Sequence, residues 1–191
     1  QCIRDAWTGI MFDGSTLPYA ENIKKTAEVA SFAKRYGVGV EGELGRVKYP
    51  DERKKNPVVE KTDLDQAADF VRRTNICAFA VAIGNTHGLP VKNERLDFGL
   101  LKKIQQHLSV PLVLHGASGT PPADIKKAIG LGICKINIDT DLRLAFTAAV
   151  RSALATDKKL FDPRSILEAG RTAVQSEVVR HIKLFGSAGT A

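Results

Sequence analysis

The sequence predicts an α/β protein built on a parallel sheet. Short apolar runs recur at intervals of about 25 to 40 residues, with amphipathic stretches between them. The runs before His87 and His115 show no polar alternation and are bounded by glycine or proline, which is typical of strands buried on both faces. Strands that alternate with helices in this way form parallel β/α units.

The predicted elements alternate along the whole chain. Strands are expected at residues 8–13, 38–44, 77–83, 111–114 and 133–138. Helices are expected at 20–36, 64–73, 98–107, from 121 to 130 or 132, at 141–155 and at 166–185.

Residues with fixed conformational preferences set the helix boundaries. Gly37 ends the first helix, since glycine readily takes positive φ. Thr62 or Asp63 caps the second helix. Pro121-Pro122 opens the fourth because proline suits a first turn, and Asp-Pro-Arg at 162–164 leads into the last. The first helix turns an apolar side to the core through Ile23, Ala27, Ala30, Phe32 and Ala33.

Length and charge narrow the class of protein. At 191 residues, the chain can bury one sizeable core, and we expect a single domain over 1–191. The formal charge is +7, but basic and acidic residues are interspersed. Residues 51–55 carry both signs beside a single aromatic, Tyr49, which favours a solvated loop over a nucleic-acid site. Small anionic substrates suit the same charge.

The cysteines and the absence of sorting signals indicate the cytoplasm. Cys2, Cys77 and Cys134 form no CxxC pattern, and two of them lie in apolar runs, so we expect small core residues in a reducing compartment. No apolar stretch approaches the roughly 20 residues of a membrane helix, and no secretory signal opens the sequence.

Polar side chains gather where the apolar runs end. Asp13, Glu43, His87, His115 and Asn137 each terminate a predicted strand. An open doubly wound sheet and a (β/α)8 TIM barrel both place their sites at the carboxyl ends of strands, so periodicity does not separate them. Five units cannot close an eight-stranded barrel. Either the sheet is open, or residues before the first one here supply the remainder.

Two histidines at equivalent strand ends predict a metal site. His87 and His115 offer imidazole nitrogens, and Glu43 or Asp13 adds oxygen, a mixture that suits Zn²⁺ and tolerates Co²⁺, Mn²⁺ or Fe²⁺. The alternative for either histidine is a hydrogen-bonded core residue. Two further histidines, at 107 and 181, fall within predicted helices, and we expect both at the surface.

Two glycine-rich or hydroxyl-rich loops predict phosphate binding. Residues 116–119 and 137–140 each link a strand end to a helix start, where backbone N–H groups and hydroxyls cradle anions. The alternative is ordinary N-capping by Ser118, Asp139 or Thr140. Arg164 is either a surface cation or a guanidinium that grips a phosphate.

Six ordered motifs together resemble the class II, metal-dependent fructose-bisphosphate aldolases and their tagatose-bisphosphate relatives. They are Met-Phe-Asp-Gly-Ser at 11–15, Val-Glu-Gly-Glu-Leu-Gly at 40–45, Gly-Asn-Thr-His-Gly at 84–88, Leu-His-Gly-Ala-Ser-Gly at 114–119, Lys-Ile-Asn-Ile-Asp-Thr-Asp at 135–141 and Asp-Pro-Arg at 162–164. The resemblance implies a (β/α)8 TIM barrel, of which this chain holds about the last five β/α units and a C-terminal helix. It also implies a cytoplasmic homodimer or homotetramer of glycolysis.

The activity implied is that of an aldehyde-lyase without a Schiff-base lysine. Fructose 1,6-bisphosphate is cleaved reversibly to dihydroxyacetone phosphate and glyceraldehyde 3-phosphate. Tagatose 1,6-bisphosphate, which differs at C4, stays open as the substrate. A non-catalytic partner or fragment that keeps the phosphate loops is a second alternative.

The resemblance assigns roles to individual residues. His87 and His115 match two of three zinc-binding histidines, Glu43 and Asp13 match acids at a second or displaced metal position, and a monovalent cation accompanies the metal. Asn137 matches a residue beside the developing enediolate, and Arg164 an arginine that reaches the other phosphate in a neighbouring subunit. The substrate-binding set is Gly88, Gly116, Ala117, Ser118, Asn137, Ile138, Asp139, Thr140 and Arg164.

The sequence departs from the family pattern twice. The third histidine and the catalytic aspartate before it have no counterpart here, and the family layout would put both upstream of Gln1. The segment 46–56 lacks the usual glycines and acidic pair. Asp51 or Glu52 is left as the proton-transfer candidate, and surface charge is the favoured interpretation for Glu52.

Overall fold

The computed structural model describes residues 1–56, 58–88 and 95–190. Its strands form one five-stranded sheet in the order β1-β2-β3-β4-β5, and every neighbouring pair is parallel. Spatial order thus follows chain order, as in successive staves of a (β/α)8 barrel, whereas a doubly wound sheet reverses direction. The predicted α/β class with five parallel strands is confirmed. The strands are β1 (Gly9–Phe12), β2 (Gly39–Leu44), β3 (Ala78–Val81), β4 (Leu112–Leu114) and β5 (Ile133–Ile136).

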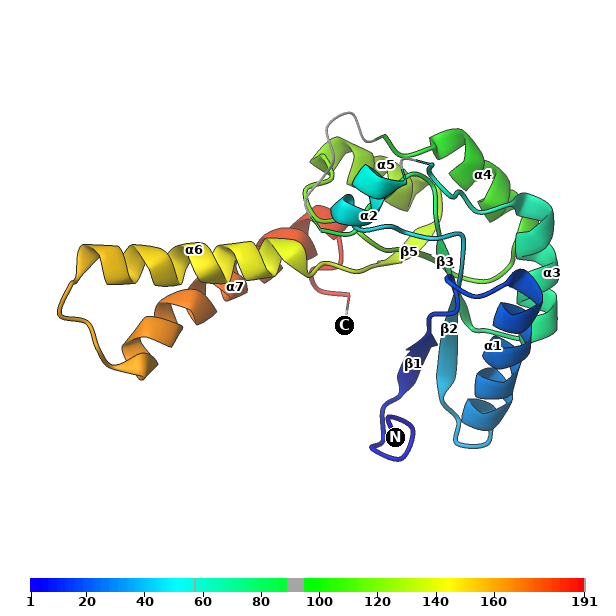
Figure 1. Ribbon diagram of the computed structural model, residues 1–191, viewed down its shortest axis with the longest axis horizontal. Helices are drawn as coiled ribbons and strands as arrows, with labels where there is room; N and C mark the ends of the chain where they lie inside the picture. Colours follow the sequence, from blue (N-terminus) through cyan, green and yellow to red (C-terminus); the bar gives the residue numbers. More distant parts are fainter. Residues whose placement is uncertain (57, 89–94, 191) are drawn as a thin grey trace.

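Four helices lie on the same, outer side of this curved sheet (Figure 1): α1 (Tyr19–Lys34), α3 (Leu64–Thr74), α4 (Phe98–His107) and α5 (Pro122–Gly130). Side-chain caps start two of them, because Asp63 accepts from the N–H of Gln66 at 2.8 Å and Asp97 from that of Leu100 at 2.9 Å. The core fills the space between helices and strands, with Phe70 and Phe79 fully buried and their ring centroids 6.0 Å apart.

Two long helices form an arm that extends away from the sheet (Figure 1). Helix α6 (Thr140–Thr156) leaves the end of β5, and α7 (Pro163–Phe185) returns along it. The arm exposes large apolar side chains, namely Leu144, Leu154, Leu167, Val178, Val179 and Ile182. Across the described part of the chain, no helix combines the length and apolar character needed to cross a membrane.

Two expectations about local structure were wrong. A short helix, α2 (Pro50–Lys55), stands where a solvated loop was expected. Pro50 occupies its first turn, and the Glu52 carboxylate accepts the Tyr49 N–H at 2.9 Å in a capping box. The cysteines are exposed rather than in the core. Cys77 precedes β3, and Cys134 lies on β5, the last strand in the order of the sheet that the described residues form.

Candidate active site

The carboxyl ends of β2, β3, β4 and β5 bring the predicted site residues to one rim. The ring centroids of His87 and His115 lie 6.1 Å apart. Gly116 makes this approach possible, because a Cβ at that position would lie 2.4 Å from the Thr86 carbonyl oxygen. Buried Asn85 ties the same two strand ends together, donating to the His115 carbonyl at 2.8 Å and accepting from the Ile83 N–H at 2.8 Å.

Two carboxylates of β2 hold the His115 imidazole. Nε2 lies 2.7 Å from Oε1 of Glu41, and Nδ1 lies 3.0 Å from Oε2 of Glu43. All three side chains are buried. Burial alone would lower the pKa of His115, but the two neighbouring carboxylates outweigh it and raise the pKa to about 9. Burial lowers the pKa of His87, against an opposing effect of the Glu43 charge.

The donor set at His115 and Glu43 fits a divalent cation. Nε2 of His115 donates to Glu41, so displacement of the Nδ1 proton by a cation would leave the Nδ1 lone pair facing Glu43. Oε2 of Glu43 is buried and, besides its ion pair with Nδ1 of His115 at 3.0 Å, accepts no well-directed hydrogen bond among the described residues. An imidazole nitrogen beside a buried carboxylate oxygen suits Zn²⁺ or a similar ion. His87, His115 and Glu43 do not bring three ligand atoms within 4.8 Å of one another, so His87 would turn its ring to join them.

A chain of polar contacts leads from His115 across the inner face of the sheet to Asn137. Lys135 Nζ donates to Oε2 of Glu41 at 2.9 Å and to Oδ1 of Asn137 at 2.7 Å. Burial would raise the pKa of Glu41, but hydrogen bonds from His115 and Lys135 outweigh it and lower that pKa. Sequence reasoning assigned no role to Glu41 or Lys135. Their two-residue spacing from Glu43 and Asn137, which puts each pair on one strand face, was the available signal.

A cavity of about 210 Å³ collects most of the predicted phosphate-binding residues. The α6 N-terminus borders it, and the positive end of a helix dipole favours anions there. Asp139, at the N-cap of α6, makes no side-chain cap and pairs with Arg143 at 2.8 Å. The residues that line the cavity are Tyr49, His87, Gly88, Gly116, Ser118, Asn137, Ile138, Asp139 and Thr140.

The two phosphate loops are joined to each other by Asp141. Its N–H donates to Oγ of Ser118 at 3.3 Å, and its Oδ2 accepts from the N–H of Gly119 at 3.4 Å. Ser118 therefore accepts a backbone N–H of α6 from the neighbouring loop. The same contact fixes the shape of the cavity wall.

The segment before α3 packs against His87. The Tyr49 ring stacks on the His87 ring with centroids 4.9 Å apart, and the His87 N–H donates to the Lys48 carbonyl at 3.0 Å. Glu52 pairs with Arg46 and caps α2, so it is a structural residue as well as a charged one. Asp51 points to solvent and pairs with Lys54 at 3.1 Å.

Besides His115, Glu43 and Asp51, three further predicted site residues do not line this cavity. Asp13 is exposed, and its Oδ1 accepts the Ser15 N–H at 2.9 Å, although its charge still acts on His87. Ala117 is buried and faces a different cavity. The Arg164 side chain is 91% exposed at the start of α7, the far tip of the arm, and pairs with Asp162 at 2.8 Å.

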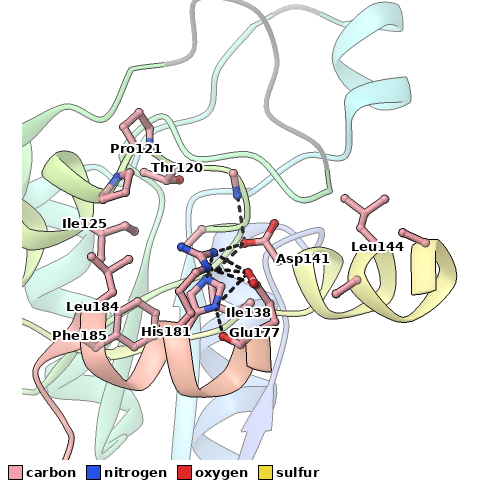
Figure 2. Close-up of a pocket in the computed structure, with 16 residues that line it drawn as sticks. Thr120, Pro121, Ile125, Ile138, Asp141, Leu144, Glu177, His181, Leu184 and Phe185 are labelled. Carbon is pink, nitrogen blue, oxygen red and sulfur yellow. Dashed lines mark hydrogen bonds and ion pairs between the residues drawn. The ribbon is translucent and has the colours of Figure 1, made fainter. Parts of the chain in front are cut away.

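That second cavity, of about 520 Å³, lies between α5, α6 and the end of α7 (Figure 2). Asp141, Glu177 and His181 place three ligand atoms within 4.8 Å of one another there. The guanidinium of Arg180 already contacts this group, since it lies 2.5 Å from Glu177 and 3.3 Å from Nε2 of His181. The expectation of a surface His181 was wrong, since it is 7% exposed and packs edge-on against Phe185. His107 is exposed, as expected.

Comparison with known proteins found a matching family model and several similar proteins. Residues 1–190 match the family model described as fructose-bisphosphate aldolase class-II. A fructose-bisphosphate aldolase of Geobacillus stearothermophilus is 40% identical over 186 residues, which cover 97% of this chain and 64% of that protein.

Two solved structures are similar over nearly the whole chain. The YdjI aldolase from Escherichia coli K12 is 41% identical with a TM-score of 0.83, over 99% of this chain and 66% of that one. The fructose-bisphosphate aldolase of Campylobacter jejuni is 25% identical with a TM-score of 0.76, over 94% of this chain and 61% of that one. The chain thus spans slightly less than two thirds of the length of these relatives.

Proposed function

Since this chain belongs to the class II fructose-bisphosphate aldolase family, we propose that it carries the dihydroxyacetone phosphate side of a zinc-dependent aldolase site. The reaction is the reversible cleavage of fructose 1,6-bisphosphate to dihydroxyacetone phosphate and glyceraldehyde 3-phosphate. The observation that carries the proposal is the cavity that joins His87 to the two phosphate loops, 116–119 and 137–140, on one rim. The Geobacillus aldolase supports the same reaction by its name.

The phosphate of the substrate would be bound at the α6 N-terminus. Backbone N–H groups of the 116–119 loop and the hydroxyls of Ser118 and Thr140 supply donors around it. The contacts of Asp141 with both loops keep these donors in place without requiring rearrangement on binding. Preorganised donors of this kind are what stabilise charge effectively.

Charge on the triose oxygens would be stabilised beside Asn137 and the two histidines. When bound by His87, His115 and Glu43, Zn²⁺ would supply an electrophile for the negative charge that develops as the C3–C4 bond breaks. The side-chain amide of Asn137 would donate to the same developing oxyanion. Asp51, exposed at the start of α2, would be the proton-transfer residue of this chain.

An assay of triose phosphate release tests the proposal. Purified protein, loaded with Zn²⁺ or stripped by a chelator, is incubated with fructose or tagatose 1,6-bisphosphate, and the product is coupled to NADH oxidation. We expect cleavage that the chelator abolishes, that His115→Ala lowers at least a hundredfold, and that His107→Ala, an exposed control on α4, leaves unchanged. Metal-independent cleavage would reject the zinc mechanism. No cleavage by the zinc-loaded protein would favour a non-catalytic partner.

We also propose that the arm makes a homodimer or homotetramer. Its exposed apolar side chains would be covered by a second copy of the chain, as expected for a patch of this kind. Arg164 at the tip of the arm is far from the cavity of its own chain, which supports a role in the site of a neighbour.

A further inference from the structure

Lys135 occupies a position between the two groups that the proposed reaction needs to orient. It lies on β5 two residues before Asn137, so both side chains point to the inner face of the sheet. Its ammonium donates to Asn137 Oδ1 at 2.7 Å and to Glu41 Oε2 at 2.9 Å. Glu41 in turn accepts from His115 at 2.7 Å. A single cation thus connects the carboxamide of Asn137 to the carboxylate behind His115.

The chemistry of an ammonium group fixes which way the Asn137 carboxamide faces. Lysine has three donors and no acceptor, so it binds only the oxygen of a carboxamide. With Oδ1 taken by Lys135, the Nδ2 donors of Asn137 are turned away from it, and Asn137 lines the 210 Å³ cavity. Without Lys135 the two orientations of the carboxamide would be close in energy, and one of them presents an acceptor to the developing oxyanion.

We propose that Lys135 is a positioning residue, which holds Asn137 with its N–H donors towards the substrate and is itself held in place by Glu41. The inference rests on the proposed function for its catalytic consequence, but not for its structural one. Lys135 does not touch the reacting atoms in this scheme. It acts through Asn137.

Steady-state kinetics of Lys135→Met tests the catalytic consequence. Deleting an oxyanion donor costs about 10²–10³ in kcat, and losing only its orientation costs less, so we expect kcat to fall about tenfold to a hundredfold with KM within about twofold. Lys135→Arg, which also offers only donors, should restore most of kcat. The matched control is Lys102→Met, an exposed lysine of α4, which should behave as the unaltered protein.

A double-mutant cycle separates positioning from a direct role. If Lys135 acts through Asn137, Lys135→Met should have almost no further effect on kcat in an Asn137→Ala background. Equal effects of Lys135→Met in both backgrounds would overturn the proposal.

A measurement without substrate or metal keeps the inference testable if no cleavage is found. The ¹⁵N relaxation of the Asn137 side-chain amide, assigned by its loss in Asn137→Asp, reports how rigidly the carboxamide is held. We expect its order parameter to drop in Lys135→Met and to stay unchanged in Lys102→Met. An unchanged order parameter in Lys135→Met would refute the positioning role, whereas lack of cleavage by the unaltered protein would refute the proposed function alone.

Discussion

Replacing Gly116 by alanine should destabilise the protein more than the same replacement at a glycine in an open turn. Gly116 has φ +59°, and a Cβ there would lie 2.4 Å from the Thr86 carbonyl oxygen and 2.9 Å from the His87 nitrogen. The positive φ alone costs a non-glycine residue about 1–2 kcal/mol. Overpacking against backbone that cannot rotate away adds about 1–3 kcal/mol. The free energy of unfolding should therefore fall by about 2–5 kcal/mol in Gly116→Ala.

Gly37→Ala is the matched control, because Gly37 has φ +68° and a Cβ there would meet nothing within 4 Å. It should show only the conformational cost of about 1–2 kcal/mol. Urea unfolding followed by circular dichroism gives both values from the shift in midpoint at constant slope. Zn²⁺ affinity should weaken in Gly116→Ala alone, since the clash pushes His87 away from His115. Equal losses of stability in the two variants would refute the close approach at Gly116.

Further predictions concern the buried acid, a tyrosine and the arm. Glu43→Gln should weaken Zn²⁺ binding about tenfold to a hundredfold in a chelator competition. It should also lower the metal-free melting temperature, because Glu43 lies 3.0 Å from the protonated His115 imidazole and its loss breaks a buried ion pair. An unchanged metal-free melting temperature would contradict this. Burial, followed by the hydrogen bond to Asp69, raises the pKa of Tyr19 from 10.0 to about 12. The protonated Tyr19 hydroxyl stabilises the folded protein fully below pH 10, and this stabilisation is lost as the pH rises towards 12. The unfolding curves of Tyr19→Phe and the unaltered protein should therefore converge in that window. A pH titration followed by absorbance at 295 nm should show an ionisation near pH 12 in the unaltered protein and not in Tyr19→Phe. If the ionisation persists in Tyr19→Phe, it belongs to another residue. Val179→Asp on α7 should lower the molar mass measured by light scattering, while Val58→Asp, exposed outside the arm, should not. A mass unaffected by Val179→Asp would argue against association through this face.

The order of the elements was predictable because local signals agree with the tertiary structure. Short apolar runs at regular spacing predicted all five strands, and the Asp63 cap and Pro122 predicted two helix starts that the structure contains. The third strand was predicted to run to residue 83, but the sheet ladder ends at Val81. Beyond it the hydrogen bonds of the buried residues pass to side chains, since Ala82 donates to Oγ1 of Thr62 and Ile83 to Oδ1 of Asn85.

The site was predictable only where its residues end strands. His87, Asn137 and the glycine loops follow from that rule and line one cavity. The pairing of Glu41 with Lys135 did not follow, because these residues are 94 positions apart and meet across the inner face of a curved sheet. Helix α2 was missed for a related reason. Its capping box depends on Tyr49 and Glu52 within a segment that charge patterning alone assigns to solvent.

Glu41 and Glu43 contact both nitrogens of His115 and so hold its ring in one orientation. Freezing a side chain during association costs about 0.5–1.5 kcal/mol, and here that loss of freedom has already occurred when the chain folded. An arriving cation would meet a ligand that needs no reorientation. The same two carboxylates raise the pKa of His115 to about 9 and so keep a proton on its ring, which the cation would have to displace before it could bind Nδ1.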